Sequence, residues 1–63
     1  MEYEDYEYSA QSIRQGFGLP AGLWYSEWVS LAAEEQGNIP LARYYARIAA
    51  HLAAELQEEE ETR

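Results

Sequence analysis

The segment from Leu41 to Leu56 has a helical pattern with more apolar surface than a short chain can bury alone. At 100° per residue, a bulky line forms along one side of the predicted helix, made of Leu41, Tyr45, Ile48, Leu52 and Leu56. Alanines widen that line to roughly half of the circumference. A single helical hairpin covers a narrower stripe, so the pattern predicts a second surface that another chain covers.

The size of the chain strengthens this expectation. Sixty-three residues form one domain at most, close to the lower limit for unaided folding. Small cores usually depend on disulfides, a bound metal or oligomerisation. The sequence has no cysteine and one histidine, which excludes disulfides, thiolate metal sites and a multi-histidine site within one chain. We therefore expect no cofactor and predict support from oligomerisation.

The charge balance limits the classes of partner. Twelve acidic residues stand against four arginines, which gives a net charge of −8. Nucleic acids and anionic membranes require positive charge on the protein, so neither is an expected partner. A basic protein surface, an apolar groove or a second copy of the chain fits better. The acidic N-terminus is unlike a targeting peptide, and no apolar run is long enough for a membrane span, which predicts a cytoplasmic protein.

Residues 1–8 form an acidic, tyrosine-rich segment that we interpret as an N-terminal arm. It is either a solvated extension or a binding arm that carries Tyr3, Asp5, Tyr6 and Tyr8 to a basic partner. A short helix capped by Ser9 is expected next, followed by a glycine-rich turn. The predicted helical domain spans residues 9–58, and residues 59–63 form an acidic tail.

Two long helices are predicted, over residues about 20–36 and 39–58. Pro20 suits a first helical turn, Gly37 supplies a left-handed stop, and Asn38 can cap the following helix. Because the link between the two helices is so short, they must pack as an antiparallel hairpin. The fold class is therefore all-α, with two hairpins paired into a four-helix bundle by dimerisation.

The predicted core combines the bulky line with large residues of the first long helix. Its members are Trp24, Trp28, Leu31, Leu41, Tyr45, Ile48, Leu52 and Leu56. The opposite, solvated face of the first long helix is expected to carry Ser26, Glu27, Ser30 and Glu34. The predicted self-association surface is the alanine flank, Ala42, Ala46, Ala49, Ala50 and Ala53, because small residues let another helix approach closely. Two tryptophans and six tyrosines exceed what one hairpin can hide, so part of the aromatic set is expected at an interface.

Residues 36–49, with the sequence QGNIPLARYYARIA, resemble the turn and second helix of a tetratricopeptide repeat. Gly37 matches the turn glycine, Ala42 the small residue at the helix crossing, Tyr45 the aromatic and Ala49 the later alanine. The first helix matches less well. The resemblance spans about one repeat, residues 24–57, and implies a helical hairpin whose stacking neighbours would come from other chains.

One polar cluster on the second long helix could carry chemistry. Arg43, Arg47 and His51 occupy consecutive turns, and Glu55 lies four residues beyond His51, within reach of it. Read as a catalytic site, His51 would be a base and Glu55 its orienting partner. The face is convex and lacks a nearby nucleophile, so we interpret it as a solvated face with intrahelical charge pairs and expect no enzyme activity.

The sequence therefore predicts a small acidic protein–protein interaction module that forms a homodimer and binds a basic or apolar protein surface. An inhibitor of the phage-encoded type, imitating nucleic acid, is one version of this hypothesis. A self-assembling scaffold or cargo adaptor is the first alternative. The second is an oligomer that binds a metal through His51 and Glu55 of neighbouring chains.

Overall fold

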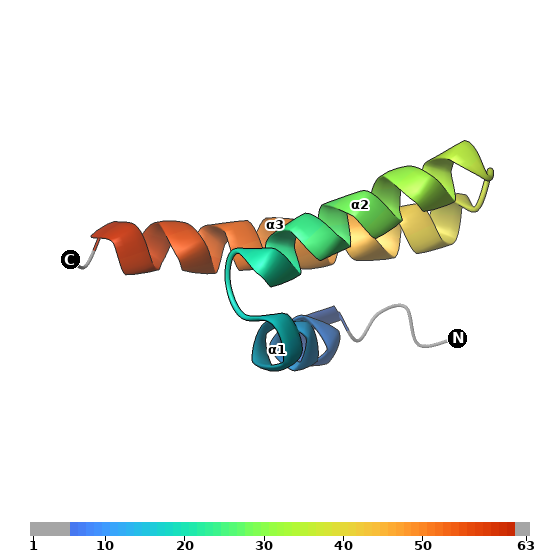
Figure 1. Cartoon of the computed structure of the whole chain (residues 1–63). Helices are drawn as coiled ribbons and strands as arrows, with labels where there is room; N and C mark the ends of the chain where they lie inside the picture. Colours follow the sequence, from blue (N-terminus) through green and yellow to red (C-terminus); the bar gives the residue numbers. More distant parts are fainter. Residues whose placement is uncertain (1–5, 62–63) are drawn as a thin grey trace.

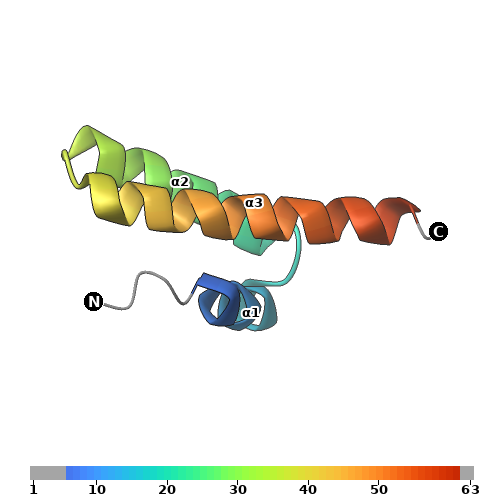
Figure 2. The ribbon, with the colours of Figure 1, turned by 180° about the vertical axis from the view of Figure 1, so that it is seen from behind.

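The computed structural model describes residues 6–61, which form three α-helices: α1 (Tyr6–Phe17), α2 (Ala21–Glu35) and α3 (Ile39–Glu61). Helices α2 and α3 lie side by side as an antiparallel hairpin, and α1 crosses one face of that hairpin (Figures 1 and 2). The all-α prediction is confirmed for the described residues. The pairing of two hairpins into a four-helix bundle stays a prediction.

Both ends of the helical domain extend further than the sequence suggested. Tyr6 and Tyr8, assigned above to an N-terminal arm, lie in the first two turns of α1. At the other end, α3 continues through the first glutamates of the predicted tail and ends at Glu61. Helix α1 has Glu7 in its first turn and Arg14 in its last, an arrangement that the helix dipole favours at both ends.

The turn between α2 and α3 has the residues that its geometry requires. The Gly37 N–H donates to the carbonyl of Glu34 (3.0 Å), and the Asn38 N–H donates to the carbonyl of Ala33 (2.9 Å). These two bonds form a Schellman motif, with Gly37 in the left-handed region at φ +82°. Asn38 then caps α3, since its side-chain oxygen accepts a bond from the N–H of Leu41 (3.4 Å).

The core lies where the three helices meet. Its buried members come from all three: Ala10, Leu23, Ile48, Ala49 and Leu52. Ile48 and Leu52 are the largest fully buried apolar side chains, and both belong to the bulky line of the sequence pattern. The other members of that line, Leu41, Tyr45 and Leu56, are half-buried, and Tyr45 and Leu56 pack against the core.

Helix α2 faces its neighbours with small residues. Gly22, Ser26 and Ala33 are buried, and the Ser26 hydroxyl donates to the Gly22 carbonyl at 2.9 Å. The Ser30 hydroxyl donates across the hairpin to the carbonyl of Ala42, also at 2.9 Å. The prediction of a solvated face containing Ser26 and Ser30 is therefore wrong. Small side chains on this face let the helices approach closely and satisfy the two hydroxyls internally.

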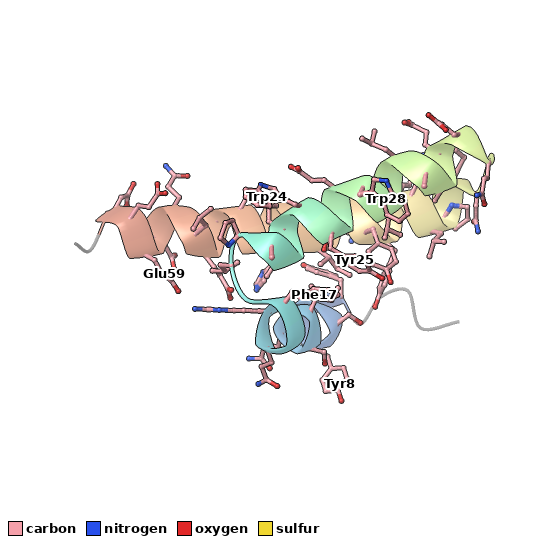
Figure 3. The ribbon with its side chains drawn as sticks, in the orientation of Figure 1. Tyr8, Phe17, Trp24, Tyr25, Trp28 and Glu59 are labelled. Carbon is pink, nitrogen blue, oxygen red and sulfur yellow. The ribbon has the colours of Figure 1, made fainter. Side chains whose placement is uncertain are left out.

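Aromatic contacts connect α1 to the hairpin. The Phe17 ring stacks on Tyr25 with ring centroids 4.7 Å apart, and Tyr25 meets Tyr45 edge to face at 6.4 Å. Figure 3 shows Phe17 and Tyr25 in the space between α1 and α2. Tyr44 extends this series of ring contacts, because its ring meets Tyr45 edge to face at 5.4 Å. The Tyr44 hydroxyl is also hydrogen-bonded to that of Ser9 in α1. Tyr44 and Tyr45 pack against the core, whereas Phe17 and Tyr25 remain partly exposed.

Candidate protein interface

The largest exposed apolar side chains of α2 lie on the side of the helix turned away from the core. Trp24, Trp28 and Leu31 are 63%, 67% and 61% exposed. Their predicted place in the core is wrong for the folded protomer. The rotation of α2 is set by its small buried face, and because Gly22 and Ser26 point inward, residues on the opposite side of the helix must point outward.

An open groove lies beside these residues, between α2 and α3. Its volume is about 440 Å³, and it is lined by Glu27, Ser30, Leu31, Ala46, Ala49, Ala50 and Ala53. Leu31 belongs both to the exposed row on α2 and to the wall of the groove. The two features therefore form one continuous area, which we call the outer apolar surface: Trp24, Trp28 and Leu31 of α2 with Ala46, Ala50 and Ala53 of α3.

The structure divides the predicted self-association alanines into two groups. Ala46, Ala50 and Ala53 are exposed on the outer apolar surface. Ala42 and Ala49 are buried inside the protomer, where α2 crosses α3. The sequence pattern placed all of them on one broad flank, and the neighbouring helix α2 covers the half of that flank nearer to it.

The polar cluster on α3 packs against α1. The guanidinium carbon of Arg47 lies 5.8 Å from the centroid of the Tyr6 ring, and the ring of His51 meets the same tyrosine edge to face at 6.4 Å. His51 Nε2 is 3.3 Å from Glu55 Oε2. Among residues 6–61, no three histidine, cysteine, aspartate or glutamate side chains come together in a way that could hold a metal ion. The cluster therefore joins α1 to α3. Within residues 6–61, His51 and Glu55 have no third metal-ligating side chain beside them.

The proposed binding-arm residues have separate places. Tyr3 and Asp5 lie outside the described residues. Tyr6 packs against the edge of the core, so its ring is already engaged within the protomer. Tyr8 is 69% exposed on α1, and Figure 3 shows it pointing away from the hairpin. It is therefore far from the outer apolar surface and does not extend it.

Ion pairs connect α1 to the acidic end of α3. Arg14 donates to Oε1 of Glu55 at 3.0 Å and also pairs with Glu59. Sequence reasoning missed these contacts, because Arg14 and the two glutamates are about forty residues apart and only the crossing of α1 brings them together. The predicted acidic tail, residues 59–63, thus contains one partner of α1, Glu59.

No protein-family model matches the chain, and neither curated proteins nor solved structures contain a match to it. The resemblance to a tetratricopeptide repeat therefore stays a prediction. Across residues 6–61, none of the helices combines the length and apolarity that crossing a membrane would require. The geometry of the outer apolar surface is thus the main guide to function.

Proposed function

We propose that this chain is a non-enzymatic protein–protein interaction module that binds through its outer apolar surface. One observation carries the proposal: Trp24, Trp28 and Leu31 each leave more than half of their surface exposed. The core of the same protomer is built largely from smaller side chains. A contiguous apolar area of this kind on a small protein is typical of a binding site.

The composition of the surface supports the same function. Tryptophan is the residue most enriched among the side chains that dominate binding energy, particularly where it fills a pocket on a partner. Here the exposed row that contains two tryptophans shares Leu31 with a groove lined largely by alanines, so the surface offers both protruding side chains and a recess. Glu27 lines the groove itself, and Glu35 is exposed one turn beyond Leu31, so the surface also presents acidic groups to a partner.

The proposal can be tested by photo-crosslinking in cells that express the full chain. A photoreactive phenylalanine derivative replaces Trp24 in one variant and Tyr8 in a matched control, since both positions carry exposed aromatic residues on different faces. We expect covalent protein adducts from position 24, to a second copy or to another protein, and few from position 8. If position 24 gives no more adducts than position 8, the outer apolar surface does not bind protein.

A further inference from the structure

We propose that the outward side of α3 is a self-association surface, on which a second copy of this chain packs its own α3 in the antiparallel direction. The two copies are related by a twofold axis perpendicular to α3 at the level of Leu52. The surface shares only Ala50 with the outer apolar surface, so the inference goes beyond the proposed function. Three properties of α3 lead to this partner: the order of its charges, their levels along the helix and the small residues between them.

The surface is a row of side chains opposite the buried side of α3. At about 100° per residue, its members fall within roughly 60° of one line, with the four- and three-residue spacing of a helix–helix seam. We call them the α3 outer row: Arg43, Arg47, Ala50, Ala54, Glu58 and Glu61. All are exposed, and the C-terminal end of α3 extends beyond α2 (Figure 1). Neither α1 nor α2 therefore covers the row.

The charge changes sign along the α3 outer row. Arginine occupies the first two positions, alanine the middle two and glutamate the last two. The glutamates lie near the negative end of the helix dipole, where an acid is unfavourable within one protomer. Among residues 6–61, neither arginine of the row forms an ion pair, whereas Arg14 pairs with two glutamates. The row thus presents opposite charges at its two ends, and an antiparallel copy of the same row complements both.

The register follows from the positions of the residues along the helix. A twofold axis perpendicular to α3 at Leu52 brings two residues to the same level when they lie equally far from Leu52 on opposite sides. Arg43 and Glu61 are each nine residues from Leu52, so Arg43 of one copy lies opposite Glu61 of the other. Ala50 and Ala54 are each two residues from it and meet at the centre. Alanines at the centre let the two helices approach closely.

Arg47 and Glu58 form the remaining pair. They lie five and six residues from Leu52, so their levels in the two copies differ by only about 1.5 Å. Counted at about 100° per residue, both deviate from the line through Arg43 in the same direction, and the twofold axis brings equivalent flanks of the row together. The symmetry generates each ion pair twice. An antiparallel second copy is therefore the partner that matches the row in both charge and level.

Sedimentation equilibrium of the purified full chain tests the inference. We expect a species of twice the 7.3 kDa chain mass, with a dissociation constant on the order of 100 µM because each chain carries a net charge of −8. Unfolding experiments at low micromolar concentration would then observe the monomer. A chain that stays at 7.3 kDa up to about 1 mM would overturn the inference.

Charge reversal at one end of the row tests the pairing. Glu61→Arg changes the net charge by +2, from −8 to −6, which lowers the general repulsion between copies. It is nevertheless expected to raise the dissociation constant about 10-fold, because Arg43 of the partner would face a like charge. Glu60→Arg is the matched control, since it makes the same change in net charge about 100° around the helix, and it should strengthen the dimer slightly. Adding Arg43→Glu to Glu61→Arg should restore the affinity. Equal effects of the two single variants would overturn the inference.

Disulfide cross-linking tests the register even if the charge variants misfold. The chain lacks cysteine, so Ala50→Cys and Ala54→Cys can be prepared as separate single-cysteine chains and mixed under oxidising conditions. We expect the 50–54 cross-link to form faster than a cross-link between Ala50→Cys and Ala53→Cys, because position 53 lies outside the row. Faster cross-linking to position 53 would assign the contact to the outer apolar surface and overturn the inference. Protein adducts from position 24 would still support the interaction module, so the two proposals fail separately.

Discussion

Gly22 of α2 lies so close to Ile13 of α1 that a side chain at position 22 would require Ile13 to move by a few tenths of an ångström. A β-carbon built on Gly22 would be 3.0 Å from Cγ2 of Ile13, and 3.4 Å from its carbonyl oxygen. This contact is the closest approach that the structure records between a glycine of the chain and another helix. It helps to fix how α1 sits on the hairpin and which side of α2 faces inward.

Replacing Gly22 with alanine is therefore expected to destabilise the fold by about 1 kcal/mol. Overpacking against Ile13 should cost about 2 kcal/mol, and the higher helix propensity of alanine should recover about 1 kcal/mol of it. Chemical denaturation followed by far-ultraviolet circular dichroism measures the difference. Gly16→Ala is the matched control, because nothing lies within 4 Å of its β-carbon position, and it should be neutral or stabilising. In an Ile13→Ala background, Gly22→Ala should also stop being harmful. Equal stabilisation by both glycine variants in the native background would contradict the close contact.

Gly37 is expected to resist replacement for a conformational reason. Its φ of +82° lies in the left-handed region, where a β-carbon costs about 1–2 kcal/mol. Gly37→Ala should lower the free energy of unfolding by that amount, and Gly37→Asn should cost less because asparagine tolerates this region better. Thermal unfolding of the three proteins gives the order. An alanine variant as stable as the parent would show that the turn does not need this conformation.

Ser26 is expected to tolerate a smaller side chain and to reject a larger one. It is fully buried, and its hydroxyl donates to a carbonyl that lies one turn earlier in the same helix. Ser26→Ala should change stability by less than about 0.5 kcal/mol, since no other polar group loses its partner. Ser26→Leu should cost about 1–3 kcal/mol through overpacking. Comparable denaturation midpoints for the two variants would argue against tight packing of this face.

The ion pairs of Arg14 should contribute little and depend on salt. The Arg14 side chain is 41% exposed, so Arg14→Gln is expected to cost under about 1 kcal/mol at low ionic strength. The loss should shrink as added salt screens the charges. Glu58→Gln on the same helix should have the opposite sign, because it removes an acid near the negative end of the helix dipole. A loss that persists at high salt would point to packing by the arginine stem instead.

Much of the hairpin could be predicted because local chemistry determines it. Gly37 and Asn38 mark the turn by conformation and capping alone, and the spacing of Ile48 and Leu52 identifies the inward side of α3. These features depend on residues a few positions apart. Each can therefore be inferred from a short stretch of sequence.

The orientation of α2 could not be predicted in the same way. Hydrophobicity favours burying Trp24 and Trp28, whereas the structure buries Gly22 and Ser26. That choice depends on the position of α1, which itself depends on contacts between residues far apart in sequence. The apolar pattern therefore predicts a place in the core for the two tryptophans, although the structure exposes both at the candidate interface.

The exposure of both tryptophans has a consequence for how this protein can be observed. Their indole rings face water in the folded protomer, so unfolding would transfer them from one aqueous environment to another and change their emission little. Covering them would shift that emission toward shorter wavelengths. When the tryptophans alone are excited, their emission thus reports mainly what touches this surface and much less whether the chain itself is folded.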